Sequence, residues 1–204
     1  MHMRIVSTYA HQQAEELLKG QYPGLLAEVM ASVAAVIAEE AQTRVDHQNP
    51  QRLLYDRLIL GKLFDRQFAQ RGWTSARCSY YLTADKKMMQ EIMGLPAAQQ
   101  KEILIRQGVK EPLYRYGETD YKKERVTVEV QLGHHTRAVT DLYAKHALFV
   151  TAGMSIAGIE ILATRKMQRE MSPTATFFEA EAYLLMRHGA GDPPVPLLLM
   201  GVEP

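Results

Sequence analysis

The stretch "TDYKKERVTVEVQLGHH", from Thr119 to His135, decides the fold of this chain of 204 residues. From Arg125 to Leu132, apolar residues alternate with polar ones. Alternation with a period of two predicts a β-strand that buries one face. Glu129 and Gln131 lie on the opposite, polar face, roughly 7 Å apart. One strand therefore carries part of the core on one side and a candidate site on the other.

Asp120 lies upstream of this strand and supplies a second carboxylate. Lys122 to Glu124 form an expected turn, so a hairpin would return Asp120 to the neighbourhood of Glu129. Two carboxylates at that separation repel each other unless a cation or a proton lies between them. Mg²⁺ prefers carboxylate and carbonyl oxygens, and the Val130 carbonyl lies between the two acids. The alternative is that these polar residues form only the solvated face of a strand.

The flanking sequence predicts alternating strands and helices. We expect strands over residues 76–82, 125–132, 156–163 and 196–202. We expect a long amphipathic helix over 24–45, a helix ending at Gly72, and helices over 85–93, 96–107, 138–150 and 177–187. The fold class that follows is α/β, with a central mixed β-sheet flanked by α-helices.

The length suits a single domain that spans residues 1–204. Within it, residues 1–75 are expected to be mostly helical and 76–204 to form the catalytic α/β core. The predicted helix over 24–45 is a candidate for a subunit interface, and the alternative is that its apolar face packs in the core of its own subunit.

Composition narrows the class of protein. A formal net charge of +1 excludes a uniformly basic surface, although it permits a local basic cleft. The single cysteine, Cys78, excludes an intrachain disulfide framework and a cysteine-rich zinc site. No run approaches the roughly 18 apolar residues that span a bilayer, and no secretory signal is recognised. We expect a cytoplasmic protein that does not interact with membranes.

Several motifs occur in an order that resembles one known family. They are "MRIV" at Met3, "YYLTAD" at Tyr80, "TDYKKERVTVEVQLG" at Thr119, "DLYAKH" at Asp141, "IEILATRKMQREMS" at Ile159 and "PLLLMGVEP" at Pro196. Together they resemble the type II restriction endonucleases of the BglII/BstYI family, which belong to the PD-(D/E)xK nuclease superfamily. The resemblance covers nearly the whole chain and implies a restriction-endonuclease-like core. The superfamily usually carries lysine where this chain has Gln131, and the BglII-like branch is similar to this chain in carrying glutamine.

The resemblance implies catalytic roles for four residues. Asp120 and Glu129 would bind Mg²⁺, with the Val130 carbonyl as a further ligand, and Gln131 would orient the attacking water. A glutamine amide is not basic, so it cannot act as the general base. The metal must then lower the pKa of the water, or a phosphate oxygen or bulk solvent must take the proton.

The resemblance and the positive charges also predict contacts with DNA. In this branch the positions of His134 and of the run Ser172–Thr176 approach the bases, and relatives differ from this chain at His134. The residues predicted to contact DNA are His134, His135, Arg137, Lys145, Ser172, Thr174, Lys122 and Lys123. Thr174 or Thr176 could equally cap the following helix, and Lys145 could be a solvated helix lysine.

The function implied is that of a Mg²⁺-dependent type II restriction endonuclease. It would cut double-stranded DNA at a short palindrome centred on GATC, RGATCY or AGATCT, and leave 5′ overhangs. A palindrome cut on both strands calls for a homodimer, and a cognate DNA methyltransferase is expected in the host. The alternatives are a nuclease of relaxed specificity and a DNA-binding module that does not cleave, although the presence of both acids argues against the latter.

Overall fold

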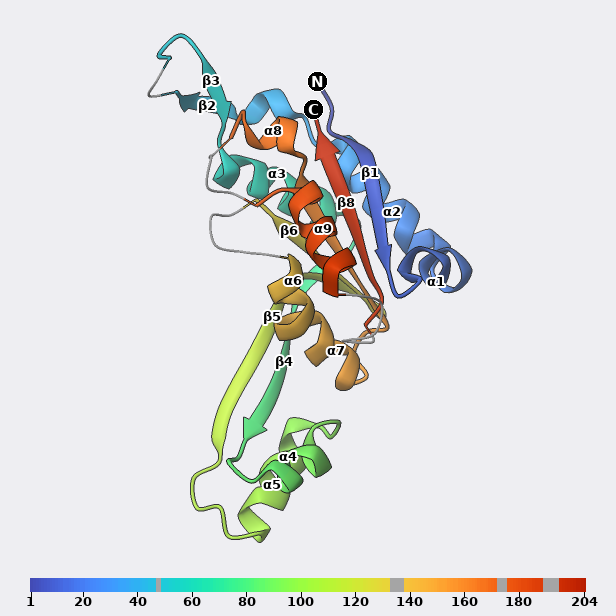
Figure 1. Ribbon diagram of the computed structural model, residues 1–204, viewed down its shortest axis with the longest axis vertical. Coiled ribbons are helices and arrows are strands. Elements are labelled where there is room, and N and C mark those ends of the chain that lie inside the picture. The colour runs from blue at the N-terminus through green and yellow to red at the C-terminus, as the bar shows by residue number, and fades with distance from the viewer. Residues whose placement is uncertain (47–48, 133–137, 172–175, 189–194) are drawn as a thin grey trace.

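The computed structural model describes residues 1–46, 49–132, 138–171, 176–188 and 195–204. Its main feature is a six-stranded sheet with the order β1-β8-β7-β6-β5-β4 (Figure 1). Strands β6, β7 and β8 run parallel, whereas β1, β5 and β4 each pair in the antiparallel sense. The bounds are β1 Arg4–His11, β4 Thr74–Leu82, β5 Leu113–Lys123, β6 Val126–Gln131, β7 Ala157–Ala163 and β8 Leu197–Glu203. The mixed sheet predicted from sequence is confirmed.

Helices cover both faces of this sheet (Figure 1). On one side lie α1, α2 and α3, and on the other lie α9 and a continuous segment made of α6, the π-helical turn η2 and α7. Among the described residues, no helix is both long enough and apolar enough to cross a membrane. The bounds are α1 Ala14–Gln21, α2 Pro23–Ala35, α3 Arg57–Gln70, α6 Ala138–Asp141, η2 Leu142–His146, α7 Ala147–Thr151, α8 Arg165–Gln168 and α9 Phe178–His188.

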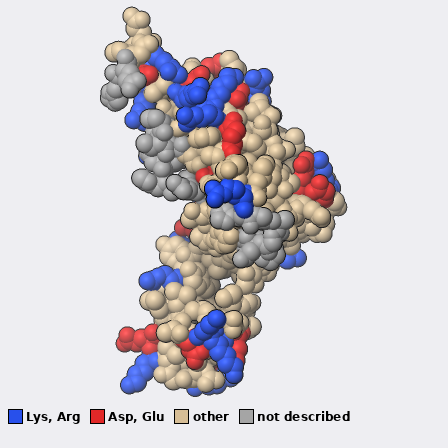
Figure 2. All heavy atoms as spheres, in the orientation of Figure 1, with Lys and Arg blue, Asp and Glu red and all other residues tan. Residues whose placement is uncertain are grey.

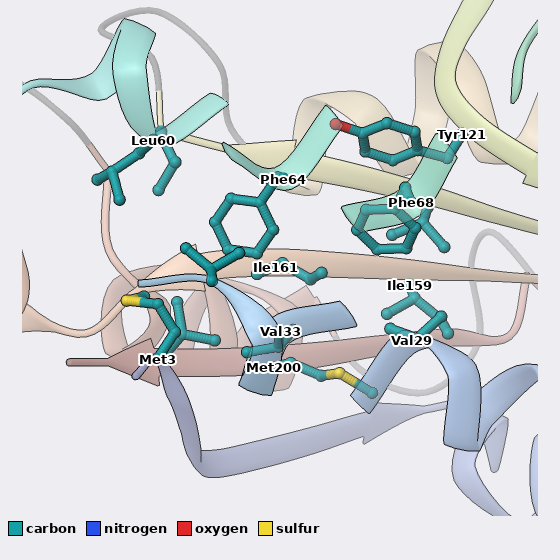
Figure 3. Close-up of a cluster of buried hydrophobic side chains, with 14 of the residues drawn as sticks. Met3, Val29, Val33, Leu60, Phe64, Phe68, Tyr121, Ile159, Ile161 and Met200 are labelled. Carbon is teal, nitrogen blue, oxygen red and sulfur yellow. The ribbon is translucent and has the colours of Figure 1, made fainter. Parts of the chain in front are cut away.

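The larger hydrophobic core lies between the sheet and the pair α2 and α3 (Figure 3). Val29 and Val33 of α2 meet Phe64 and Phe68 of α3 over the sheet. Ile159 and Ile161 of β7 face this core, whereas Leu162 contributes to a smaller core under α9. Successive residues of β7 thus point to opposite faces, and both faces are buried, as expected for a central parallel strand.

Strands β4 and β5 extend beyond the rest of the sheet as a two-stranded arm (Figure 1). β5 pairs with β4 from Leu113 to Lys122, but with β6 only from Tyr121 to Lys123. The far end of the arm carries α4 (Lys86–Ile92) and α5 (Ala97–Arg106). Gln100 of α5 accepts a hydrogen bond from the backbone N–H of Tyr81 at 2.7 Å, which joins α5 to β4.

The N-terminal third departs from the sequence prediction. The helix expected over 24–45 ends at Ala35, and the chain continues as a 3₁₀ turn η1 (Ala38–Ala41) and strand β2 (Gln42–Val45), which pairs with β3 (Leu53–Tyr55). The prediction is wrong beyond Ala35 because Val36 adopts an extended conformation and accepts a backbone hydrogen bond from Met3 at 2.9 Å. β1, which no local pattern predicted, adds a strand from the mostly helical part to the central sheet.

Candidate active site

A β-bulge positions Asp120 on strand β5. Between Thr74 and Ala76, β4 advances by two residues, whereas the paired stretch of β5 advances by three, from Lys122 to Thr119. Asp120 lies within this irregular step. Bulges bend a strand and redirect its side chains, and they occur often beside active sites. The bulge therefore sets the direction of the Asp120 side chain where β5 starts to pair with β6.

Asp120 and Glu129 meet at this point, and each carboxylate accepts a hydrogen bond from a backbone N–H of the other strand. The backbone N–H of Asp120 donates to Glu129 Oε1 at 3.3 Å. The backbone N–H of Val130 donates to Asp120 Oδ2 at 3.0 Å. Glu129 is buried and Asp120 is exposed. The structure thus brings together the two acids that the sequence paired, with one of them open to solvent.

The environment of Glu129 disfavours its negative charge. Burial raises the pKa of Glu129 to about 7, and the neighbouring charges of Asp120 and Glu160 act in the same direction. The Lys145 ammonium opposes this effect because its Nζ lies 2.8 Å from Glu129 Oε2. A buried carboxylate with a raised pKa binds a cation strongly once it is ionised, since water does not screen it.

The π-helical turn η2 supplies polar groups from above the sheet. Asp141, just before the turn, and Lys145, within it, lie one turn apart, and Lys145 Nζ is 3.2 Å from Asp141 Oδ2. The Gln131 side chain donates a hydrogen bond through Nε2 to the same oxygen of Asp141. Single π-helical turns are rare and occur often at functional sites. This turn places Asp141 and Lys145 over the polar face of β6.

A buried network that the sequence prediction missed lies beside Glu129. Glu160 of β7 is fully buried and stands in register with Glu129 across the parallel pair β6–β7. The His146 ring joins it to β6, with Nε2 3.0 Å from Glu160 Oε1 and Nδ1 3.1 Å from Thr127 Oγ1. Burial holds the pKa of Glu160 well above the usual range of a glutamate, and it lowers the pKa of His146 to about 4. A single acid inside an apolar strand was the signal that could have identified Glu160.

The other residues predicted to contact DNA fall into two groups. Lys123 lies against Glu28, with Nζ 2.7 Å from Oε2, and also donates to the Arg71 carbonyl at 2.8 Å. Lys122 donates to the Glu124 carbonyl. The predicted contacts that lie outside the described residues are those of His134, His135, Arg137, Ser172 and Thr174.

Figure 2 shows Lys and Arg side chains gathered over α8, toward the end of the molecule that carries both termini.

The donor atoms at this site suit a hard divalent cation. Asp120 and Glu129 offer carboxylate oxygens, and the Val130 carbonyl, which accepts from the Leu132 N–H at 3.2 Å, retains a second lone pair. In the described part of the chain, no cluster of three or more His, Cys, Asp or Glu side chains could hold a metal. Mg²⁺ is commonly held by only one or two carboxylates together with waters and substrate phosphates. The pair Asp120 and Glu129 fits that pattern.

Comparison with solved structures shows the same fold. The chain is 14% identical to free BglII, with a TM-score of 0.57 over 98% of this chain and 79% of that one. It is 15% identical to the restriction endonuclease BglII complexed with a DNA 16-mer, with a TM-score of 0.57 over 98% and 76% of the two chains. No match to a curated protein is found.

A family model establishes the relationship that these low identities leave open. The model described as restriction endonuclease BglII/BglIII matches residues 6–202. This match includes the bulge in β5, the paired acids on β5 and β6, and the turn that carries Lys145. The chain therefore belongs to the restriction endonuclease BglII/BglIII family and is a type II site-specific deoxyribonuclease.

Proposed function

We propose that this endonuclease hydrolyses phosphodiester bonds of double-stranded DNA within a short palindrome, in a reaction that requires Mg²⁺. The observation that carries the proposal is the convergence of Asp120 and Glu129 from adjacent strands. Each carboxylate accepts a hydrogen bond from a backbone nitrogen of the other strand, at 3.3 Å for Glu129 and 3.0 Å for Asp120. The structural likeness to BglII bound to DNA agrees with a double-stranded substrate.

Asp120, Glu129 and the Val130 carbonyl would hold the cation. When bound, Mg²⁺ would neutralise the charge that develops on the scissile phosphate and lower the pKa of a nearby water. Asp120 is open to solvent and can approach DNA, whereas Glu129 provides a buried charge at the base of the site. The hydrogen bonds from backbone amides fix the positions of the two carboxylates before the substrate arrives, which reduces the cost of reorganisation.

Gln131 and Lys145 would act on the reacting groups. Gln131 is buried on the same face of β6 as Glu129, so its amide can orient a water molecule without removing its proton. Lys145 currently pairs with Glu129 at 2.8 Å. With a cation held by Glu129, this ammonium would be available to contact a phosphate oxygen, which is the contact with DNA predicted for Lys145.

We propose a recognition site centred on GATC, of the form RGATCY or AGATCT, with cleavage that leaves 5′ overhangs. Support comes from the likeness of the sequence motifs to the BglII/BstYI group, with BstYI as the nearer member. His134, His135, Ser172 and Thr174 are proposed to approach the bases. The remaining basic residues, Lys122, Lys123 and Arg137, are proposed to contact the backbone. For Lys123 this would require its ion pair with Glu28 to open.

A symmetric site cut on both strands requires a homodimer with one active site for each strand. We propose that the chain forms such a dimer in the cytoplasm and that a methyltransferase protects the host DNA. We also propose that residues 1–204 form a single domain. The apolar side chains of α2, including Val29 and Val33, pack within their own subunit, so a dimer contact by α2 would use its outer face around Met30. Light scattering should give about twice 23.1 kDa.

Plasmid digestion tests the proposed function directly. Incubation with Mg²⁺ should give discrete fragments, and EDTA should prevent cleavage. Sequencing of the cut ends should show GATC within each site and a 5′ overhang. A smear of fragments would instead indicate a nuclease of relaxed specificity. Intact DNA together with a gel shift would indicate a DNA-binding module without cleavage, and would overturn the proposal.

A further inference from the structure

Asp141 lies in the candidate active site, although the function proposed above assigns it no role. Its side chain is buried, and it lies just before the π-helical turn that faces the polar side of β6. One oxygen, Oδ2, accepts a hydrogen bond from Gln131 Nε2 and lies 3.2 Å from Lys145 Nζ. Lys145 in turn donates to Glu129 Oε2 at 2.8 Å. A chain of contacts thus runs from Gln131 through Asp141 and Lys145 to Glu129.

The chemistry of this contact selects one orientation of the Gln131 amide. A glutamine amide has a donor end, Nε2, and an acceptor end, Oε1, of nearly the same shape. An ionised carboxylate can only accept hydrogen bonds, so it attracts Nε2 and repels Oε1. With Nε2 on Asp141, the carbonyl oxygen Oε1 points away from that carboxylate. In that orientation the amide can offer Oε1 as an acceptor for an O–H of a water, whereas the flipped amide would offer only N–H donors.

The surrounding structure keeps Asp141 in place. The next residue, Leu142, is fully buried in the core beneath α9, and His146 at the end of the turn is buried as well. His146 bonds both Glu160 of β7 and Thr127 of β6, which ties the turn to two strands of the sheet. The carboxylate therefore has little freedom to move when DNA binds, and it can impose its preference on the amide.

We propose that Asp141 is a positioning residue that sets the orientation of the Gln131 amide and holds the Lys145 ammonium over Glu129. This proposal rests on the proposed function, because it concerns how Gln131 orients the attacking water. It assigns Asp141 no contact with DNA or with the reacting atoms. Its effect on cleavage passes through Gln131 and Lys145.

The first test observes the Gln131 amide in the protein without metal or DNA. In a ¹⁵N-labelled sample, the side-chain NH₂ signals of Gln131 are assigned by their loss in Gln131→Glu. A charge-assisted hydrogen bond should shift these signals away from the positions of exposed glutamines. In Asp141→Asn they should move toward those positions. Signals that stay in place in Asp141→Asn would overturn the proposal.

The second test is a double-mutant cycle in single-turnover cleavage. Asp141→Asn should lower the cleavage rate by about 10–100-fold, the usual loss for a group that orients a site residue, with unchanged DNA affinity in EDTA. In the background of Gln131→Ala, the same substitution should cause a clearly smaller loss, because the residue through which Asp141 acts is gone. Equal losses in both backgrounds would show that Asp141 does not act through Gln131.

Two further variants separate charge from structure. Asp56→Asn is a matched substitution at the N-cap of α3, where an amide oxygen can still accept from Leu58, so cleavage and the Gln131 signals should not change. Asp141→Glu keeps the charge and should retain the shifted Gln131 signals. If Asp141→Asn does not fold, Asp141→Glu decides alone, and exposed-like signals in it would contradict the proposal. Absence of cleavage by the wild-type protein would instead refute the proposed function. The same set of measurements includes the wild type, so the two failures are distinguished.

Discussion

The two faces of strand β6 are both buried, yet they are stabilised in opposite ways. Val126 and Val128 point into the core formed with α2 and α3 and need no specific partner. Glu129 and Gln131 point toward the π-helical turn and are almost as deeply buried, but each depends on a charged neighbour, Lys145 or Asp141. Apolar burial stabilises the fold in proportion to area. Polar burial is unfavourable unless each group is paired, so the second face depends on specific partners and carries the candidate active site.

The largest effect should follow from changing the polar face. Glu129→Ala removes a buried carboxylate that we propose as a cation ligand, and single essential catalytic groups contribute about 10⁴-fold or more to rate. We expect cleavage with Mg²⁺ to fall by about that factor, whereas the affinity for DNA in EDTA stays the same. Glu118→Ala, on the exposed arm beside Arg77, is the matched control and should cleave normally. Normal cleavage by Glu129→Ala would refute the site.

The next effect should come from the apolar face. Phe64 is fully buried between α3 and the sheet (Figure 3), so Phe64→Ala should lower the free energy of unfolding by about 3–5 kcal/mol. Urea denaturation followed by circular dichroism would measure this loss. Tyr183→Ala, at an exposed aromatic residue on α9, should change stability by no more than about 0.5 kcal/mol. Equal effects of the two substitutions would show that Phe64 does not belong to the core.

A glycine at the boundary between sheet and turn offers a smaller perturbation. A Cβ at Gly158 would overlap the His146 ring, so Gly158→Ala should destabilise the protein by about 1–3 kcal/mol. It should also slow cleavage, because His146 adjoins Lys145. Gly61→Ala provides the same substitution in α3 with open space around it, and should stabilise by about 0.5–1 kcal/mol. Thermal unfolding of both variants checks the sign, and stabilisation by Gly158→Ala would show that the turn packs less closely than described.

The smallest effect concerns pH. Burial lowers the pKa of His146 to about 4. Between pH 6.5 and 4 the unfolded chain therefore binds a proton that the folded state does not, so the free energy of unfolding falls as pH falls through that window. Burial raises the pKa of Glu129 to about 7, so the folded state binds a proton between pH 7 and 4.5 that the unfolded chain does not. Stability then rises as pH falls. The two contributions oppose each other between pH 6.5 and 4.5.

Glu129→Gln removes one of these opposing contributions. Its melting temperature should therefore fall more steeply than that of the wild type as pH is lowered from 6.5 to 4.5. Differential scanning fluorimetry across this window measures the difference, and carboxylates common to both proteins cancel in the comparison. Parallel curves for the two proteins would show that Glu129 titrates normally in the fold.

Much of the fold could be predicted from local patterns. The alternation from Arg125 to Leu132 and the apolar run of β7 predicted their strands, and the helix predicted to end at Gly72 corresponds to α3, because burial imposes a period on each element. β1 was not predicted, since its residues acquire their strand conformation by pairing with β8. The helix predicted to reach Val45 failed for a related reason. Backbone pairing with the N-terminus competes with helix formation, and a window of neighbouring residues does not contain that information.

By itself, the sequence determined which strand carries acids on one face and valines on the other, because side-chain direction alternates along any β-strand. It also determined that Asp120 could return beside Glu129, since a short turn separates them. Only the tertiary structure decided that Asp141 and Glu160 join this site, and that Lys145, already predicted to contact DNA, pairs with Glu129. These residues come from a helix segment and a neighbouring strand, and their approach depends on the parallel pairing of β6 with β7 and on the π-helical turn packed above them. Contacts between distant segments are set by packing of the whole chain, which no local period records.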